Sequence, residues 1–345
     1  MKFILKVILP VFLLVSAGAG FYFYNQFSQF KEAGIPQDVS SFEIKKGSHI
    51  RRVAKDLKNR GLISSDLYFS ILAKLKRQDT KIKAGEYSLK KGMKPTDLLD
   101  IFSRGKTLQY TTRIPEGGTY KELVKLVKAD KNLKHTLTDA DFNSIMTKLK
   151  TDYPHHQPEG WFLPDTFSYP KNTTDLQFLQ RAHNAMTKEL NNLWKDRKPF
   201  KGINTPYDAL ILASIIEKET GHSSDRTKVA RVFLNRLEKD MLLQTDPTVI
   251  YGMGSRYKGN IRKKDLKRDT PYNTYTRKGL PPTPIATPSL ASLQAVFHPA
   301  DGDILYFVAK GKGDGTSYFS KTYKEHKKAV IKYLLNGKAS RYKGK

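Results

Sequence analysis

The segment that most constrains the fold runs from residue 205 to residue 221. Thr205 can act as an N-cap, Pro206 suits the first helical position, and Asp208 stands at the third position of a capping box. Residues 209–216 are apolar nearly all round the predicted helix, and Gly221 is a natural stop after its last turn. A helix with this surface is stable when a domain surrounds it. We therefore expect it to lie buried at the centre of a domain.

Two glutamates, Glu217 and Glu219, fall in the last turn of this helix. The partial negative charge of a helix C-terminus and apolar surroundings both disfavour an ionised carboxylate, so both raise its pKa, as a general acid near neutral pH requires. Helical spacing places Glu219 on the face of the large aliphatic residues and Glu217 above Ala213 and Ser214. We favour Glu219 as the acid and Glu217 as its helper or structural partner. The alternative is that both are solvated and balanced by Lys218.

The N-terminal segment over residues 7–24 carries no charge and follows Lys2 and Lys6. A helix of this length spans about 27 Å, close to the hydrocarbon thickness of a bilayer, and it ends in four aromatic residues of the type found at the lipid–water boundary. The preceding positive charge predicts a single span with a cytoplasmic N-terminus and an exported remainder. The alternative, a signal peptide cleaved near residues 17–19, exports the same part of the chain.

The net charge of +28 results from 61 Lys and Arg against 33 Asp and Glu in 345 residues. Such an excess favours polyanions, whether nucleic acid, anionic lipid or an acidic wall polymer. The basic runs 256–268 and 338–345 support a nucleic-acid binder, but the predicted export argues against that partner. We expect these runs to hold the exported part near anionic lipid or wall polymer, with no nucleic acid bound.

Several kinds of catalytic chemistry are excluded or disfavoured by composition. The sequence has no cysteine, so disulfides, zinc–thiolate sites and cysteine nucleophiles are excluded. The eight histidines are scattered without the spacing of metal ligands. Neither a glycine-rich phosphate loop nor a serine nucleophile elbow is present. We therefore expect a site with neither metal nor cofactor.

A short pattern repeats three times in the first 130 residues. Ile-Lys-Lys-Gly at 44–47, Leu-Lys-Lys-Gly at 89–92 and Ile-Pro-Glu-Gly at 114–117 are each followed by apolar residues with helical spacing. Each copy predicts a strand, a glycine turn and a helix. Residues 42–106 are then expected to run strand, helix, helix, strand, helix, and they resemble a LysM domain, a fold that binds chains containing N-acetylglucosamine. The alternative is a packing module that binds no sugar.

The second half of the chain differs in composition, because Pro and Gly are mixed with aromatic residues there. A domain boundary is expected between residues 130 and 155. Spacing predicts a core helix over 225–239 and a short strand over 303–309 that is apolar on both faces. We expect Arg231, Asn235 and Arg236 of the helix to be solvated, and the alternative is that they face a cleft. Together these features predict an α+β protein.

Six segments resemble, in order, those of the endolytic murein transglycosylases, the MltG/YceG-like family. They are EGWFLPDTF at 159–167, IIEKET at 215–220, LQTDPTVIYG at 243–252, YNTY at 272–275, GLPP at 279–282 and HPA at 298–300. The resemblance covers essentially the whole chain. One departure is that Thr287 and Ser289 stand where the family more often has Asn and Gly, and the missing glycine can reshape that loop.

The resemblance implies a division of the chain into five parts. These are a transmembrane anchor at 1–25, a polar linker at 26–41, the LysM-like module at 42–106, a small α+β connecting region at 107–150 and a mixed α/β catalytic domain at 151–340. It further implies a location in the plasma (inner) membrane with the catalytic domain outside the cytoplasm. Peptidoglycan strands are the implied substrate, and peptidoglycan synthases are implied partners.

The second glutamate of the family's I-E-K-E-T segment is its catalytic residue, and it corresponds to Glu219. The implied reaction begins when the Glu219 carboxyl protonates the glycosidic oxygen between N-acetylmuramic acid and N-acetylglucosamine. The carboxylate then takes the proton of the muramic acid C6 hydroxyl, which closes onto C1 as a 1,6-anhydro ring. This chemistry needs one carboxylate, whereas hydrolysis needs two.

Polar residues of the other segments are expected to line the cleft, and a role in stabilising turns or the core is an equal alternative for each. These residues are Glu159, Gln244, Asp246, Thr248, Tyr272, Asn273 and Tyr275. Two other functions stay open. One is a muramidase, which hydrolyses the same bond, and the other is a membrane-anchored glycan-binding scaffold without catalysis.

Overall fold

The computed structural model describes the backbone of residues 2–153, 157–311, 313 and 315–342, and their side chains from Leu9 onward. Residues 343–345 of the basic tail lie outside the described part. The chain divides into two compact units, residues 1–110 with 168–172, and residues 111–167 with 173–345. Within the described residues the elements are mostly helices, with three two-stranded sheets, so the α+β class is confirmed.

The first unit contains the predicted order of strand, helix, helix, strand and helix. Its elements are α1 (Lys2–Glu32), β1 (Val39–Ile44), α2 (Ile50–Asn59), α3 (Asp66–Leu75), β2 (Gly85–Leu89) and α4 (Pro95–Arg104). β1 and β2 pair antiparallel, with Phe42 opposite Tyr87, and the Phe42 and Tyr87 rings pack against Phe102 of α4 in the core. The element order is therefore as expected, and the likeness to LysM stays a prediction.

The predicted membrane anchor falls on α1, a helix of 31 residues. Large apolar side chains from Leu9 to Tyr24 are exposed along it. No helix among the residues searched, which are the described ones, is both long enough and apolar enough to cross a membrane. The first two residues of the predicted span, Val7 and Ile8, lie outside the described side chains.

The polar linker expected over residues 26–41 is not found as such. α1 continues to Glu32, and Phe27 and Phe30 are buried in the core of the first unit together with Ile35. The Ile35 amide donates to the Met93 carbonyl over 2.9 Å. Three apolar residues among polar neighbours were enough to pack one side of this segment, while its polar residues face solvent.

The three predicted copies of strand, glycine turn and helix are all present. β1 ends at Ile44, β2 ends at Leu89, and β3 (Gln109–Arg113) ends just before the third copy, which leads into α5 (Tyr120–Ala129). The turn glycines Gly47, Gly92 and Gly117 have φ of 81°, 85° and 68°, in the left-handed region that favours glycine. The repeated sequence therefore encodes a repeated backbone turn.

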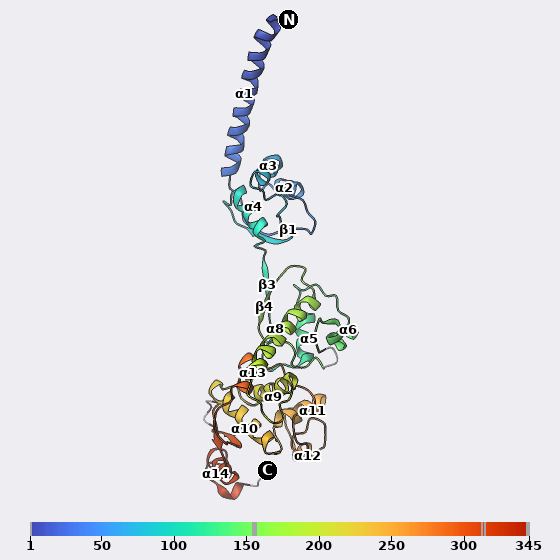
Figure 1. Ribbon diagram of the computed structural model, residues 1–345, viewed down its shortest axis with the longest axis vertical. Helices are drawn as coiled ribbons and strands as arrows, with labels where there is room; N and C mark the ends of the chain where they lie inside the picture. Colours follow the sequence, from blue (N-terminus) through green and yellow to red (C-terminus); the bar gives the residue numbers. More distant parts are fainter. Residues whose placement is uncertain (1, 154–156, 312, 314, 343–345) are drawn as a thin grey trace. The chain divides into compact units, whose positions relative to one another are not determined.

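The second unit is mainly helical, and Figure 1 shows its elements from green to red. After β3 and α5 come α6 (Asp139–Asn143), α7 (Ile145–Lys148), β4 (Thr166–Pro170), α8 (Asp175–Lys195), α9 (Pro206–Glu219), α10 (Arg226–Glu238), α11 (Asp246–Met253), α12 (Lys263–Lys267), α13 (Leu290–Phe297), β5 (Tyr306–Ala309), β6 (Ser317–Ser320) and α14 (Tyr323–Tyr333). β3 pairs with β4, and the division between the units falls inside both strands. The core helix predicted over 225–239 and the strand predicted over 303–309 correspond to α10 and to the shorter β5.

The centre of the second unit is α9. Residues 209–216 are all buried, and α9 packs against α8, α10, α11 and α13 (Figure 1). β5 and β6 form an antiparallel hairpin that packs against α14. The prediction of a helix buried at the centre of a domain is confirmed.

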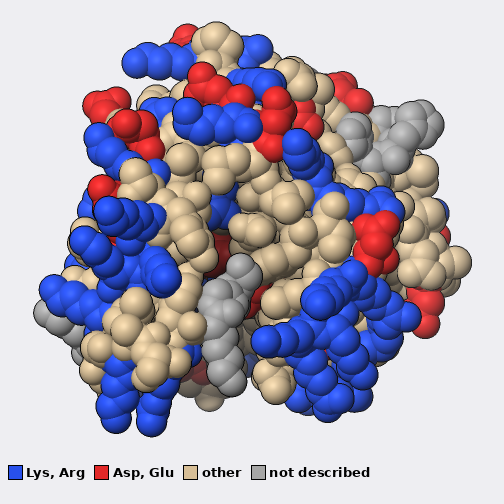
Figure 2. Space-filling view, turned by 90° about the horizontal axis from the view of Figure 1, so that it is seen from below, with Lys and Arg blue, Asp and Glu red and all other residues tan. Residues whose placement is uncertain are grey.

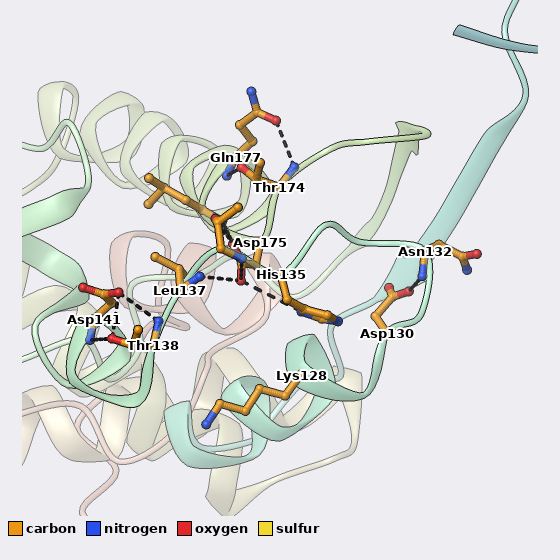
Figure 3. A network of polar contacts seen from close by, with 12 residues as sticks. Lys128, Asp130, Asn132, His135, Leu137, Thr138, Asp141, Thr174, Asp175 and Gln177 are labelled. Atoms are coloured by element: carbon orange, nitrogen blue, oxygen red, sulfur yellow. Dashed lines mark hydrogen bonds and ion pairs between the residues drawn. The ribbon is translucent and has the colours of Figure 1, made fainter. Parts of the chain in front are cut away.

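A buried carboxylate, Asp175, fixes the loop before α6 onto the start of α8. Its oxygens accept hydrogen bonds from the amides of Thr136 and Leu137 and from the Thr136 hydroxyl, over 2.6–3.0 Å (Figure 3). Burial alone would raise the pKa of Asp175, but these hydrogen bonds outweigh it and hold the pKa below its ordinary value. The ionised form therefore stabilises the fold at neutral pH.

We expect Asp175→Ala to lower the free energy of unfolding by roughly 3 kcal/mol, because it leaves buried amides without an acceptor. Because the folded pKa of Asp175 lies below its unfolded value, its stabilisation is complete above the unfolded pKa and is lost as the pH falls through the folded one. Urea unfolding followed by circular dichroism measures this change. Asp139→Ala is the control, because the Asp139 side chain is 85% exposed and pairs with Lys128 at the surface, where about 0.5 kcal/mol is expected. Equal urea midpoints for Asp175→Ala and Asp139→Ala would contradict a stabilising role of Asp175.

Candidate functional site

The two ends of α9 are capped by different contacts. At the start, the Thr205 hydroxyl accepts from the Asp208 amide, and the Asp208 carboxylate accepts from the Thr205 amide, so the predicted capping box is present. At the other end the helix stops at Glu219, and Thr220 is extended with φ of −142°. Gly221 does not adopt the left-handed conformation expected of a stop residue. The Thr220 hydroxyl instead accepts from the His222 amide over 3.1 Å and holds the exit turn.

Glu217 is bound to the start of α13. Its Oε2 accepts hydrogen bonds from the Ser289 amide over 3.0 Å, from the Ser289 hydroxyl over 2.5 Å and from the Ser292 hydroxyl over 2.6 Å. An anion is stabilised at a helix N-terminus, so this contact offsets the unfavourable position of Glu217 at the end of its own helix. Glu217 therefore makes structural contacts with α13, and a structural partner was one of the two roles expected for it.

Ser289, where the family more often has Gly, is part of this contact. Its hydroxyl accepts from the Ser292 amide as the N-cap of α13, so the serine adds bonds that a glycine lacks. The neighbouring Thr287 pairs by its backbone with residues 117–118, over 2.7 and 2.8 Å. The departure from the family pattern is thus accommodated in a well-bonded loop.

Glu219 is half-buried and opens into a cavity of about 270 Å³ within the second unit. The Thr245 hydroxyl donates a hydrogen bond to its carboxylate. The cavity is lined by Glu219, Phe233, Arg236, Leu243, Gln244, Asp246, Tyr275, Tyr306, Phe307, Tyr323, His326 and Tyr342. The site thus combines two carboxylates, a guanidinium and an imidazole with walls of aromatic rings.

Gln244, Asp246 and Tyr275, which were predicted to line a cleft, are brought together in this cavity. Gln244 has a left-handed φ of 50°, an unfavourable conformation for a residue with a side chain, and its amide donates to the Thr274 carbonyl over 3.0 Å. Asp246 begins α11, and the Tyr275 hydroxyl donates to its carboxylate. Burial, and then this carboxylate, raise the pKa of Tyr275, so its hydroxyl stays protonated as a donor.

Thr248 does not reach the cavity. It is fully buried, and its hydroxyl bonds the Thr245 carbonyl and the Thr274 hydroxyl, each over 2.8 Å. Thr274 also accepts from the Thr245 amide over 3.1 Å. These bonds fix the turn that holds Thr245 against Glu219, so Thr248 supports the site from behind.

Tyr272 and Asn273 also lie away from the cavity lining. The Tyr272 hydroxyl bonds the Thr283 hydroxyl over 2.9 Å, and its ring packs against Tyr251. Asn273 is buried, and its side-chain amide donates to the carbonyls of Asp265, Leu266 and Arg268. Of the segment 272–275, Tyr275 alone is among the residues that line the cavity of Glu219.

The solvated side favoured for α10 is wrong at Asn235 and Arg236, whereas the alternative, a residue facing a cleft, matches Arg236, which lines the cavity. Arg236 is 8% exposed, its Nε donates to the Leu305 carbonyl over 2.8 Å, and its Nη1 donates to the Leu243 carbonyl over 2.7 Å. Burial lowers the pKa of Arg236, and nearby Tyr306, Tyr275 and Glu219 oppose that shift.

Asn235 is also buried and donates to the carbonyls of Gly302 and Ile304. Arg231, half-buried, donates to the Ala300 carbonyl. The polar side of α10 therefore satisfies the carbonyls of the segment that leads into β5. Sequence reasoning missed this because the acceptors lie nearly 70 residues away.

His326 and the tyrosines of β5 and α14 were not predicted as site residues. The His326 ring stacks on Tyr306 with 5.2 Å between centroids, and burial lowers its pKa. The helical position of His326 in a charged, lysine-rich segment gave no signal of a cavity. Only the packing of α14 against the β5–β6 hairpin brings it there.

Glu159 lies in a second cavity, of about 690 Å³, and not in that of Glu219. It is 6% exposed, and it accepts from the Tyr120 amide at the start of α5 over 2.7 Å and from the Tyr251 hydroxyl over 3.0 Å. Burial raises the pKa of Glu159 to about 7, although these hydrogen bonds act in the opposite direction. Among the described residues, no group of three or more His, Cys, Asp or Glu could hold a metal ion.

The site places a carboxylate at a helix end facing a cavity with aromatic walls, an arrangement typical of acid–base sites. Residues 42–332 match the YceG-like family. The endolytic murein transglycosylase of Bacillus subtilis is 32% identical over 309 residues, which cover 85% of this chain and 84% of that protein. The chain belongs to the YceG-like family.

Two further proteins share the similarity. The endolytic murein transglycosylase of Streptococcus pneumoniae is 29% identical over 359 residues, covering 94% of this chain and 64% of that longer protein. The crystal structure of a YceG-like protein from Listeria monocytogenes superposes with a TM-score of 0.51 at 31% identity, covering 85% of this chain and 99% of that one. The similarity therefore extends over both units of the chain.

The raised pKa of Glu159 predicts a pH-dependent contribution to stability. The folded protein holds this proton up to about pH 7, whereas the unfolded chain loses it near 4.5, so stability falls between these values as the pH rises. Glu159→Gln imitates the protonated form. We expect it to match the wild type at pH 5 and to exceed it at pH 8 by up to roughly 3 kcal/mol. Urea unfolding at both pH values measures the difference, and a constant difference would refute the assignment.

Proposed function

We propose that the protein is an endolytic murein transglycosylase whose catalytic acid and base is Glu219. The observation that carries the proposal is the position of Glu219, at the end of a buried helix and open to a cavity with aromatic walls. The names of the relatives in B. subtilis and S. pneumoniae support the substrate, the murein glycan strand. Aromatic faces beside polar groups suit a sugar chain, whose rings offer both apolar faces and hydroxyls.

The reaction follows from one carboxyl group that first donates and then accepts a proton. The Glu219 carboxyl protonates the oxygen that joins C1 of N-acetylmuramic acid to N-acetylglucosamine, and that C1–O bond breaks. The C6 hydroxyl of the muramic acid then bonds to C1, and its proton passes to Glu219. The carboxyl group is thereby restored, and no water is consumed.

Other residues of the cavity have positioning roles in this proposal. The hydrogen bond from Thr245 orients the Glu219 carboxylate. Arg236 supplies a positive charge near the same cavity, with its guanidinium fixed by backbone carbonyls. The aromatic walls limit the access of water, which competes with ring closure.

A second candidate, a muramidase, is favoured by one specific observation. Asp246 lines the same cavity as Glu219, so the site offers the second carboxylate that hydrolysis uses. The Asp246 carboxylate accepts a hydrogen bond from Tyr275, which holds it at the start of α11. The two candidates differ in their product, because hydrolysis leaves reducing ends and transglycosylation leaves 1,6-anhydro ends.

The test is a digest of purified peptidoglycan, with products identified by mass spectrometry. We expect 1,6-anhydro ends from the wild type, and a loss of at least about a hundredfold in rate for Glu219→Gln, because the amide cannot donate the proton. Glu217→Gln is the matched control. It changes the neighbouring carboxylate, which bonds α13, and should lower stability while leaving the anhydro product.

Two results of the digest would count against the proposal. Reducing ends from the wild type would establish the muramidase. Full activity of Glu219→Gln would remove Glu219 from catalysis and leave a different group as the acid.

We also propose that residues 7–24 anchor the protein in the plasma membrane, with the catalytic unit outside the cytoplasm. The absence of charge in this segment and the exposed apolar side chains of α1 from Leu9 to Tyr24 support the proposal. Anchoring beside the membrane is consistent with action on strands close to where they are made.

An alkaline phosphatase fused after Glu32 tests this topology. We expect the fusion to be active and to sediment with membranes, because the enzyme acquires its disulfides outside the cytoplasm. Deletion of residues 7–24 is the control and should abolish both the phosphatase activity and the sedimentation with membranes. An inactive fusion that stays in the cytoplasm would overturn the proposal, and a soluble exported fusion would indicate a cleaved signal peptide.

A further inference from the structure

A third cavity, of about 270 Å³, lies beside the C-terminal half of α11 and is strongly basic. Five of its lining residues are cations: Arg256, Lys258, Arg262, Lys264 and Arg268. The remaining lining residues are Val249, Gly252, Met253, Asn260, Asp265 and Thr270. Figure 2, seen from below, shows a dense group of Lys and Arg at the lower right, and Figure 1 places α12 on the right.

The positive charge of this cavity is hardly neutralised by the protein itself. Asp265 is the single carboxylate of the lining, and its Oδ2 accepts from the Arg262 amide over 2.9 Å as part of the capping box of α12. Within the described residues, none of the five cations forms an ion pair with a carboxylate. Five positive charges and one negative charge leave a local balance of +4.

Arg256 donates to the carbonyls of Met253 and Gly252, each over 3.4 Å, and other contacts hold the backbone around the cavity. The buried side-chain amide of Asn273 donates to the carbonyls of Asp265, Leu266 and Arg268, over 2.7–3.4 Å. Asp269 and Arg277 form a two-point ion pair, over 2.8 and 2.9 Å. These bonds fix the main chain from Asp265 to Arg268, while the five cationic side chains of the cavity are exposed to solvent and open to an anion.

We propose that this cavity binds a multiply charged phosphate group, namely a pyrophosphate or two neighbouring phosphodiesters. A carboxylate carries one charge and would leave most of the local balance of +4 uncompensated, whereas two phosphodiesters offset half of it and a pyrophosphate, which carries more charge, offsets most of it. Arg guanidinium groups bind phosphate oxygens in pairs, and lysines add point charges around them. Soluble anions and the headgroups of a bilayer both present such phosphates.

The first experiment is a calorimetric titration of the full chain, in micelles of an uncharged detergent, with inorganic pyrophosphate. We expect saturable binding by the wild type. Lys264→Gln with Arg268→Gln removes two cavity cations, and at about fivefold per cation the affinity should fall on the order of 25-fold. Lys263→Gln with Lys267→Gln is the matched control, because it removes the same charge from the same short helix at residues that do not line the cavity.

These variants separate a site from a general surface attraction. A site predicts that the control pair keeps wild-type affinity within about twofold, whereas a diffuse basic surface predicts equal losses for both pairs. Glu219→Gln should bind pyrophosphate as the wild type does, because Glu219 lines a different cavity. The anion site can therefore fail or hold independently of the proposed catalysis.

The source of the phosphate is identified with proteoliposomes of uncharged phosphatidylcholine, with and without about one third phosphatidylglycerol. Trypsin cleavage after Lys258, a cavity residue that both double variants keep, reports on occupation of the cavity. Protection by phosphatidylglycerol that the cavity variant loses assigns the site to headgroups. Protection by pyrophosphate alone assigns it to a soluble or strand-borne phosphate. Absence of saturable pyrophosphate binding together with absence of protection in either vesicle, or equal losses in the two double variants, overturns the proposal.

Discussion

The second unit depends on how α9 is held at its two ends. Its apolar middle requires burial, and four other helices provide it. The C-terminal end would carry two carboxylates at the negative pole of a buried helix, which is unfavourable. The three hydrogen bonds to Glu217 from the start of α13 place one of those charges at the positive pole of another helix. Residues two apart point roughly 200° from each other around a helix, so the same bonds orient Glu219 the other way, into its cavity.

The segment 272–275 also stabilises the second unit through several hydrogen bonds. Asn273 holds the carbonyls around α12, Thr274 bonds the turn that carries Thr245, and Tyr275 donates to Asp246. One short turn thus supports the carboxylates of the Glu219 cavity and the backbone of the basic cavity. A motif that looked like a set of sugar contacts is better understood as a scaffold from which a single residue reaches the site.

Local signals in the sequence predicted the elements well. The capping box at Thr205 and the three glycine turns rest on periodicity and backbone chemistry within one or two turns. The buried Phe27 and Phe30 were missed because two apolar residues among polar ones give little periodicity. The burial of Arg236 and the position of His326 in the cavity were missed for a different reason. Their acceptors and ring partners are distant in sequence, and a polar residue on a helix gives no local indication that distant carbonyls will bury it.

The three cavities share α11 as a wall. Asp246, at its first turn, lines the cavity of Glu219, Pro247 and Tyr251 line that of Glu159, and Val249 and Met253 line the basic one. Gly252 is required at its place because a Cβ there would lie 2.9 Å from the Cβ of Tyr272. A helix of eight residues, about 12 Å long, cannot be displaced at one end without moving the other. Close packing of Gly252 on the 272–275 segment therefore fixes the position of Asp246, and with it one wall of the Glu219 cavity, relative to the basic cavity.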